Sequence, residues 1–402
     1  MRRILMRLAA RALNISPSPT LAIDARAKKM IAAGEQVINF GAGEPDFDTP
    51  EHIKQAAVEA LQNGMTKYTP VAGTPALKAA IIEKFKQDNG LDYHPDQIVV
   101  SVGAKHSLYN AIQVLCEAGQ EVILPAPYWV SYLEQIRLAG AVPVIVQTRA
   151  ENGYKLTVEE LKPVISPRTA LLILNTPGNP TGSVYCREEL SALGEVLIEK
   201  GVTIISDEIY EKLIYDGFEH VSIASLSPEL KEKTVVINGV SKAYAMTGWR
   251  IGYAAAPLPI AGAMSDLQSH STSNPTSIAQ AASVSALKGT QEPLKQMVVE
   301  FTRRRDYMLE RLTHIKGVSC HRPGGAFYMF PNVQSFIGYT YKDKHIGSAT
   351  DLAGIFLEEA KVAVVAGAAF GDDRCFRLSY AVSMENIKEG LDRIQQVLSQ
   401  VT

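Results

Sequence analysis

Short apolar runs alternate with amphipathic stretches along most of this chain. The runs are rich in Val, Ile and Leu and are bounded by Gly, Pro, Asn or Asp. They predict strands over residues 98–102, 122–124, 142–146, 171–174, 203–206, 235–237 and 251–255. Helical spacing of apolar residues predicts helices over 51–63, 76–89 and 188–200. Strands that alternate with helices predict an α/β fold, with a large domain whose mostly parallel sheet is flanked by helices.

The pattern changes near residue 290. Apolar residues from Leu294 to Ile315 follow one long helical spacing, and residues 316–402 read as short strands and helices with a final helix near 385–398. We expect an N-terminal arm and the start of a small domain over 1–48, the large domain over 49–290, and a smaller α+β domain over 291–402. The run Arg303-Arg304-Arg305 is expected to be a solvated helix face.

The charge balance excludes several classes of protein. Lys plus Arg is 40 and Asp plus Glu is 42 in 402 residues, so the net charge is −2. This balance argues against a protein whose main partner is nucleic acid or an anionic membrane. The chain contains no apolar stretch of about 18 residues, so we expect no membrane span.

The first 13 residues, MRRILMRLAARAL, contain four arginines and no acid. Transit peptides have such a composition, so an organelle import signal is one interpretation. We favour an amphipathic arm that packs on a cytoplasmic protein. The cysteines lie far apart without a CxxC pair, so we expect buried free thiols and neither a disulfide scaffold nor a metal site; they are Cys116, Cys186, Cys320 and Cys375.

Several familiar catalytic motifs are missing, among them GxxxxGK[ST], HExxH and GxSxG. Residues 41–46, GAGEPD, do not form GxGxxG, which disfavours a dinucleotide-dependent oxidoreductase. Polar residues instead follow predicted strands at 103–105 (GAK), 175–182 (NTPGNPTG), 206–210 (SDEIY) and 239–253 (GVSKAYAMTGWRIGY). Ligands of α/β sheets bind outside the carboxyl ends of the strands, so these segments predict the site.

Eight motifs occur in a characteristic order over nearly the whole chain. They are AGEPDFDTP (42–50), KYTPVAGTPALK (67–78), PAPYWVSY (125–132), NPTG (179–182), SDEIYE (206–211), SKAYAMTGWRIGY (241–253), GAFY (325–328) and FRLSYA (376–381). With these motifs the chain resembles the class I (fold type I) pyridoxal-phosphate aminotransferases. Within that family it looks like the bacterial and plastid-type aspartate aminotransferase branch.

The resemblance implies pyridoxal 5′-phosphate as the cofactor, an electron sink whose aldehyde forms a Schiff base with a lysine. Lys242 matches that lysine, which also moves the proton between substrate and cofactor. Asp207 is expected to pair with the pyridine nitrogen, and Tyr210 and Asn179 to bond the ring oxygen. Trp129 is expected to stack on the ring. Asn179 and Trp129 are expected to contact the substrate as well.

The resemblance also implies how the cofactor phosphate is held. Backbone N–H groups of Gly103 and Ala104 are expected to form its cup together with Ser241 and Arg250. In the family a tyrosine of the other subunit also touches this phosphate, and Tyr68 is the matching residue. We therefore expect a homodimer whose active site is shared across the interface.

The same resemblance assigns the substrate contacts. Arg377 matches the arginine that holds the α-carboxylate through a bidentate pair. Gly43 lies where the backbone approaches the substrate. Lys105, expected beside the cofactor, matches the lysine that meets the distal carboxylate in this branch. Ser18 and Thr20 match residues of the N-terminal arm that close over the substrate side chain.

The implied reaction is a ping-pong transamination between L-aspartate and 2-oxoglutarate, through a pyridoxamine form, which gives oxaloacetate and L-glutamate. Prephenate or aromatic aminotransferase activity, alone or in addition, is the open alternative, because Lys105 could also meet the second carboxylate of prephenate. Lyases and aminocyclopropane-carboxylate synthase share the fold type and also remain open. A transcription regulator that reuses this fold would need an added DNA-binding domain, and about 40 residues precede AGEPDF.

Overall fold

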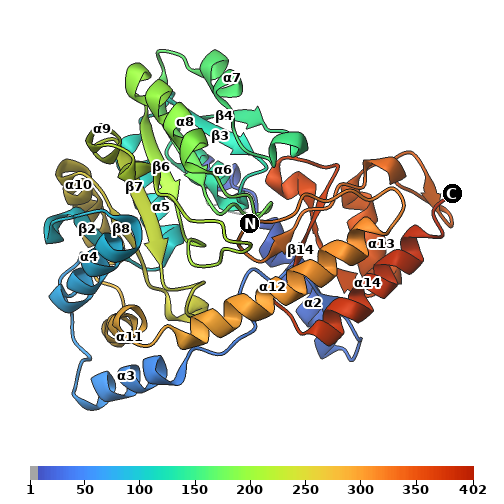
Figure 1. The fold of residues 1–402 in the computed structure, drawn as a ribbon, viewed down its shortest axis with the longest axis horizontal. Coiled ribbons are helices and arrows are strands. Elements are labelled where there is room, and N and C mark those ends of the chain that lie inside the picture. The colour runs from blue at the N-terminus through green and yellow to red at the C-terminus, as the bar shows by residue number, and fades with distance from the viewer. Residues whose placement is uncertain (1–7) are drawn as a thin grey trace, which may run out of the picture.

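The computed structural model describes residues 8–402 and has a seven-stranded sheet at the centre of its larger lobe (Figure 1). Strand β8 runs antiparallel to both of its neighbours, and every other neighbouring pair in this sheet is parallel. The expected mostly parallel sheet is therefore confirmed. In spatial order the strands are β2 (Ile98–Ser101), β8 (Gly252–Ala255), β7 (Thr234–Gly239), β6 (Thr203–Asp207), β5 (Thr169–Asn175), β3 (Glu121–Ala126) and β4 (Val142–Gln147).

Both faces of this sheet are buried, which explains its continuous apolar strands. On β5, Leu171 and Ile173 pack into one hydrophobic cluster and Leu172 and Leu174 into another, as the twofold period of a strand requires. The first face is covered by α5 (Ala104–Leu115), α6 (Val130–Leu138) and α10 (Leu258–Ser269). The second is covered by α7 (Val158–Leu161), α8 (Arg187–Lys200) and α9 (Pro228–Lys231).

The smaller lobe combines segments from both ends of the chain. Strand β1 (Ile38–Asn39) pairs in parallel with β12 (Val362–Ala363). A separate antiparallel sheet joins β13 (Val365–Ala366), β14 (Phe376–Ser379) and β9 (Tyr328–Met329), and β10 (Thr340–Tyr341) pairs with β11 (Lys344–His345). The helices of this lobe are α2 (Pro19–Ala32), α13 (Ala349–Glu359) and α14 (Met384–Leu398). The domain boundaries placed at residues 48 and 290 stay a prediction.

The 22-residue helix α12 (Glu292–Thr313) runs from the larger lobe to the smaller one (Figure 1). At its start lie α3 (Glu51–Gln62), α4 (Pro75–Asn89) and α11 (Ser277–Lys288). The expected solvated face is confirmed for Arg303, whose side chain is 58% exposed, and is wrong for Arg304 and Arg305 at 8% and 0%. These two arginines are buried because each pairs with a carboxylate that is distant in the sequence.

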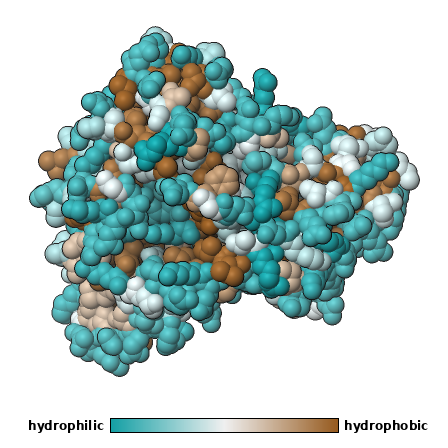
Figure 2. All heavy atoms as spheres, viewed as in Figure 1, coloured by the Kyte–Doolittle hydropathy of each residue, from teal (hydrophilic) through white to brown (hydrophobic). Residues whose placement is uncertain are grey.

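On the face shown in Figure 2, hydrophilic residues predominate and hydrophobic ones appear in patches between them. No helix within residues 8–402 is long and apolar enough to cross a membrane. Residues 1–7 of the arginine-rich arm lie outside the described residues, and Leu13 at the end of α1 (Ala10–Leu13) is exposed. The four thiols are free as expected. The expectation of burial is confirmed for Cys116 and Cys375, whereas Cys320 is half-buried and Cys186, at the N-cap of the surface helix α8, is exposed.

Candidate active site

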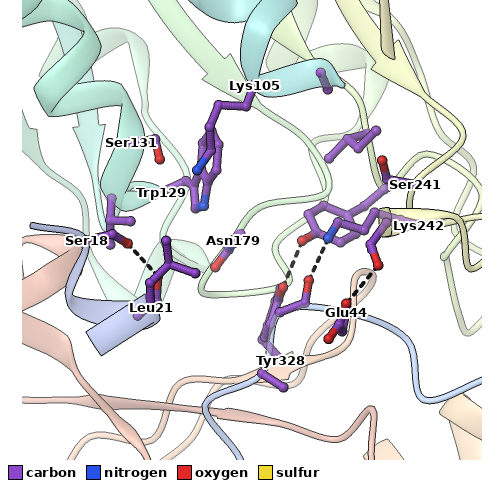
Figure 3. Close-up of a pocket in the computed structure, with 18 of the residues that line it drawn as sticks. Ser18, Leu21, Glu44, Lys105, Trp129, Ser131, Asn179, Ser241, Lys242 and Tyr328 are labelled. Carbon is purple, nitrogen blue, oxygen red and sulfur yellow. Dashed lines mark hydrogen bonds between the residues drawn. The ribbon is translucent and has the colours of Figure 1, made fainter. Parts of the chain in front are cut away.

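A cavity of about 450 Å³ lies at the carboxyl ends of β5 and β6, facing β14 of the smaller lobe (Figure 3). Its walls come from segments that are far apart in the sequence. Most of the predicted site residues line it: Ser18, Thr20, Gly43, Ala104, Lys105, Trp129, Asn179, Asp207, Tyr210, Ser241, Lys242, Arg250 and Arg377. Gly103 and Tyr68 do not line the cavity.

Lys242 follows the end of β7 and is only partly exposed. Its Nζ donates a hydrogen bond to the carbonyl oxygen of Gly43 at 2.6 Å, and lies 6.0 Å from the ring centroid of Tyr210. Burial lowers the pKa of Lys242 to about 8; Glu44 opposes this shift and nearby cationic side chains add to it. A substantial fraction of this amine is therefore neutral near physiological pH, as a proton acceptor or nucleophile requires.

Asp207 ends β6 and its carboxylate is buried beside Lys242. The hydroxyl of Tyr132 donates to its Oδ2 at 2.6 Å, and the N–H of Ile209 donates to its Oδ1 at 3.2 Å. Burial raises the pKa of Asp207 to about 6, against the lowering effect of these two hydrogen bonds. The side chain is therefore a buried anion at neutral pH, and a cationic group in the cavity would stabilise it.

Two asparagines of the NTPGNPTG segment connect the two lobes at the cavity. The side chain of Asn175 donates to the backbone carbonyl of Asp207 at 3.0 Å and accepts from the N–H of Asn179 at 2.9 Å. The Oδ1 of Asn179 then accepts from Arg377 Nη1 at 3.0 Å. This chain of hydrogen bonds fixes the acidic end of the cavity relative to the arginine at the opposite end.

A positive corner lies where α5 begins. Arg250 has left-handed backbone angles (φ 59°, ψ 51°), and its guanidinium donates to two backbone carbonyls at 2.8 and 3.2 Å. A Cβ at Gly103 would lie 2.3 Å from Arg250 Nη2, so only glycine permits this approach. The N–H of Gly103 donates to Ser101 at 2.8 Å, and α5 starts at Ala104. A helix N-terminus beside a guanidinium suits an anion such as phosphate.

Arg377 on β14 is buried, yet none of the described residues forms an ion pair with it. Its Nη2 donates to the carbonyl of Gly41 at 2.8 Å, and its Nε has no hydrogen-bond partner. The guanidinium lies 4.3 Å from the ring centroid of Tyr328. Burial lowers its pKa. A buried cation with neutral partners is destabilising alone, and an anionic ligand would compensate for this.

Another wall of the cavity carries Lys105 and the N-terminal segment (Figure 3). The Nζ of Lys105 lies 5.0 Å from the ring centroid of Trp129, and its pKa is lowered by burial and by the charge of Arg250. The hydroxyls of Ser18 and Thr20 lie 3.0 Å apart at the start of α2. This wall is polar and cationic, and it suits an acidic substrate side chain.

Two tyrosines that line the cavity, Tyr132 and Tyr328, were not predicted as site residues from the sequence. Tyr132 bonds Asp207, as described above, and the hydroxyl of Tyr328 lies 2.8 Å from that of Tyr210. Each is the last residue of a recognised motif, PAPYWVSY or GAFY. The motifs were therefore a signal, but only the folded chain brings these hydroxyls to their partners.

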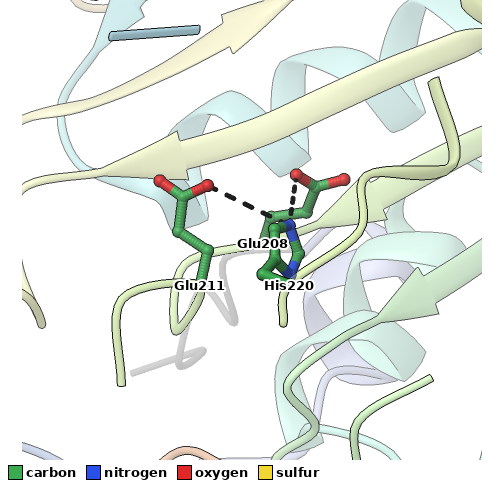
Figure 4. Close-up of side chains that lie close together, drawn as sticks. All are labelled: Glu208, Glu211 and His220. Carbon is green, nitrogen blue, oxygen red and sulfur yellow. Dashed lines mark hydrogen bonds and ion pairs between the residues drawn. The ribbon is translucent and has the colours of Figure 1, made fainter. Parts of the chain in front are cut away.

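A second polar cluster is formed by residues that do not line the cavity (Figure 4). Ligand atoms of Glu208, Glu211 and His220 lie within 4.8 Å of one another. His220 Nε2 is 2.9 Å from Glu208, which also accepts from two serine hydroxyls at 2.7 Å, and Lys84 pairs with Glu211. Because protein groups already satisfy these carboxylates, we interpret the cluster as a network that fixes segment 207–211.

Comparisons with known proteins identify the family of this chain. Residues 35–394 match the family "Aminotransferase class I and II". The aspartate aminotransferase of Geobacillus stearothermophilus is 54% identical over 98% of this chain and 99% of its own length. The aspartate/prephenate aminotransferase of Cereibacter sphaeroides is 50% identical over 95% and 96%. The crystal structure of the Rhizobium meliloti aspartate aminotransferase superposes with a TM-score of 0.95 at 47% identity, over 99% of this chain and 100% of the other. The chain belongs to the class I and II aminotransferases.

Proposed function

We propose that this aminotransferase transfers the amino group of L-aspartate to 2-oxoglutarate, giving oxaloacetate and L-glutamate. One observation carries the proposal: Arg377, which is buried and forms no ion pair with any described residue, shares a cavity with the amine of Lys242, whose pKa is lowered to about 8. An amino acid offers a carboxylate to the first and an α-proton to the second. The names of the relatives support aspartate as the amino donor.

The residues of the cavity fit pyridoxal 5′-phosphate. The corner of Arg250 and α5 suits its phosphate, with Ser241 and the N–H of Ala104 as further donors. The buried carboxylate of Asp207 suits a protonated ring nitrogen, and the amine of Lys242 suits an aldehyde. When bound, the cofactor supplies an aldehyde that condenses with amines and a ring that withdraws electrons from the substrate α-carbon.

The protein's own side chains bind the substrate, move the proton and hold the cofactor ring. Arg377 binds the α-carboxylate through two parallel hydrogen bonds and so orients the α-carbon. Lys242 Nζ removes the proton from that carbon, which its lowered pKa makes feasible at neutral pH. Tyr210 and Asn179 would hold the bound cofactor through hydrogen bonds to its ring oxygen, and Trp129 would pack against the ring.

The acidic preference is assigned to the wall that carries Lys105. Its ammonium group meets the distal carboxylate of aspartate or 2-oxoglutarate. Ser18 and Thr20, in the segment that leads into α2, close over the substrate side chain, and the backbone at Gly43 borders it.

We further propose a homodimer in which Tyr68 completes the phosphate site of the partner. The side chain of Tyr68 is 90% exposed in the single chain. Its segment is nevertheless well anchored: Gln280 donates to Thr69 at 3.0 Å, and Gln268 donates to the carbonyl of Val71 at 2.9 Å. A fully exposed aromatic ring on a fixed segment is suited to a protein contact.

A second candidate is transamination of prephenate, alone or in addition. A neighbouring cavity of about 560 Å³ shares Lys105 and Arg250 with the first. It offers space beyond Lys105 for a bulkier dicarboxylate. The name of the Cereibacter sphaeroides relative includes this activity.

The visible absorption band of the cofactor-loaded protein tests both candidates. Small amounts of L-aspartate or L-glutamate should bleach it and release the matching 2-oxo acid, whereas L-phenylalanine should require far higher concentrations. Bleaching by L-phenylalanine alone would overturn the acidic preference. A protein that transfers the amino group of glutamate to prephenate, but not to oxaloacetate, would establish the second candidate instead. Absence of bleaching with every amino acid would overturn the transamination.

A further inference from the structure

The side chain of Arg304 on helix α12 contacts both its own helix and the N-terminal part of the chain. Its Nη1 donates to both carboxylate oxygens of Asp46 at 2.8 and 2.9 Å, and its Nε donates to Glu300 at 2.8 Å. Its guanidinium lies 5.4 Å from the ring centroid of Phe47, whose ring meets that of Phe301 edge to face at 5.5 Å. Arg304 therefore joins α12 to segment 41–47 of the N-terminal part of the chain.

Residues 41–44 of this segment line the active-site cavity. The carbonyl of Gly41 accepts from Arg377 Nη2 at 2.8 Å, and the carbonyl of Gly43 accepts from Lys242 Nζ at 2.6 Å. The two cationic side chains assigned to substrate binding and proton transfer thus depend on one short segment. Two glycines give this segment an intrinsically flexible backbone, so it requires an anchor.

The anchor lies close to both carbonyls. Among the described residues, the pair between Asp46 and Arg304 is the one ion pair made by segment 41–46. Only Glu44 and Pro45 separate Asp46 from Gly43, and the proline ring fixes one backbone angle of the connection. A displacement of Asp46 should therefore shift the Gly43 carbonyl, which the hydrogen bond from Thr247 to Glu44 at 2.7 Å also restrains.

We propose that Arg304 is a positioning residue: by holding Asp46, it keeps the Gly43 carbonyl on Lys242 and the Gly41 carbonyl on Arg377. The catalytic consequence rests on the proposed function, whereas the geometric part does not. Arg304 itself does not line the cavity. Its effect acts through the backbone of segment 41–46 on the orientation of two other side chains.

The chain offers a matched control. Arg303 pairs with the same Glu300 at 2.7 Å but makes no hydrogen bond to Asp46. The variants are therefore Arg304→Gln, Arg304→Lys and Asp46→Asn, with Arg303→Gln as the control. Asp46→Asn breaks the ion pair from the surface side, since that carboxylate is 30% exposed, and it remains informative if Arg304→Gln fails to fold.

The first measurement uses cofactor-free protein, so that it does not depend on the reaction. Each variant is labelled briefly with acetic anhydride, and modification of Lys242 is quantified by mass spectrometry relative to the exposed Lys295. Arg304→Gln and Asp46→Asn should label Lys242 about fivefold faster, the effect of losing one hydrogen bond from its ammonium group. They should also raise hydrogen exchange of residues 41–46. In both labelling rate and hydrogen exchange, Arg304→Lys should lie between the wild type and Arg304→Gln, and Arg303→Gln should match the wild type.

The second measurement uses the cofactor-loaded enzymes and aspartate. Because Arg377 and Lys242 are both misplaced, KM should rise and kcat should fall in Arg304→Gln and Asp46→Asn, with partial recovery in Arg304→Lys. Folded variants whose Lys242 labelling and exchange equal those of Arg303→Gln would overturn the positioning role. Equal changes in all four variants would overturn it too, since a general effect on α12 would explain them. Altered labelling without activity toward aspartate in any protein would leave the positioning intact and refute the proposed substrate.

Discussion

Burial shifts the pKa values of three ionisable side chains in the cavity toward their neutral forms. Lys242 has a pKa lowered to about 8, Asp207 has one raised to about 6, and Arg377 has one lowered by burial. Each of these shifts reports a charged form that the folded chain alone does not stabilise. Such groups lower stability, and together in one cavity they indicate a ligand that carries complementary charges.

The first prediction concerns Arg377→Met. Removal of a buried cation without an acidic partner should leave the free energy of unfolding of the cofactor-free protein within about 1 kcal/mol of the wild type, or raise it. Loss of two charge-assisted hydrogen bonds to the substrate carboxylate should lower kcat/KM by about 100-fold or more. Urea unfolding and steady-state kinetics measure the two effects, with the exposed Arg303→Met as the control. A variant that loses several kcal/mol of stability would show that Arg377 is structural.

The second prediction concerns the hydrogen bond from Tyr132 to Asp207. A carboxyl group is ionised above its pKa, and this hydrogen bond lowers the pKa of Asp207, so its removal in Tyr132→Phe should raise that pKa above about 6. Pyridoxal-phosphate binding that requires the ionised carboxylate should then weaken at a higher pH in the variant. Binding of pyridoxal phosphate to the cofactor-free protein is followed by absorbance between pH 5 and 8, which gives the pH at which binding is half lost (the midpoint). The exposed Tyr339→Phe should keep the wild-type midpoint, and an unchanged midpoint in Tyr132→Phe would contradict the argument.

At the scale of elements, the close approach of helix α5 to Arg250 creates the anion site. The backbone of β8 also lies against this corner, since a Cβ at Gly252 would be 2.0 Å from the N atom of Ala104. Glycine at both positions is therefore a packing requirement. Strand β8, the start of α5 and the guanidinium of Arg250 pack closely together, and this packing requires that Gly103 and Gly252 carry no side chain.

The third prediction separates this packing from ordinary backbone strain. Gly103 and Gly90 both have positive φ, at 85° and 65°, but a Cβ at Gly90 would meet no atom within 4 Å. Gly90→Ala should cost about 1 kcal/mol of stability, and Gly103→Ala should cost more, because its backbone angles (φ 85°, ψ 158°) suit only glycine. Gly103→Ala should also weaken pyridoxal-phosphate binding by about tenfold or more, because Arg250 must move. Equal affinities of the two variants would show that this corner does not bind the cofactor.

Elements with a local pattern could be predicted from the sequence, whereas contacts between distant residues could not. All seven strands of the large sheet were expected close to their observed positions, because their apolar runs are visible locally. Burial on both faces requires such runs in every strand except the largely exposed edge strand β4. The burial of Arg304 and Arg305 was missed, because their partners Asp46 and Asp216 lie 258 and 89 residues away. The roles of Tyr132 and Tyr328 were missed for the same reason: their hydroxyls meet groups 75 and 118 residues away.

At the scale of the whole molecule, the cavity lies between the larger lobe and β14, and α12 connects the two lobes (Figure 1). Segments 18–20 and 41–44 also contribute to its walls, so both ends of the chain meet at the site. Tyr68 does not line this cavity, and its side chain is 90% exposed. If it belongs to an active site, that site is on another molecule.

The fourth prediction tests this shared site by mixing two inactive proteins. Lys242→Ala lacks the amine, and Tyr68→Ala lacks the side chain assigned to the partner's phosphate site. In a mixed dimer, one of the two sites would combine an intact Lys242 with an intact Tyr68 from the other subunit. Activity should therefore reappear after subunit exchange and approach about half of the wild-type value per mixed dimer, since one site of two is restored. Exchange is verified independently by mass spectrometry of differently tagged chains. Mixed dimers that form but remain inactive would place Tyr68 outside the partner's site.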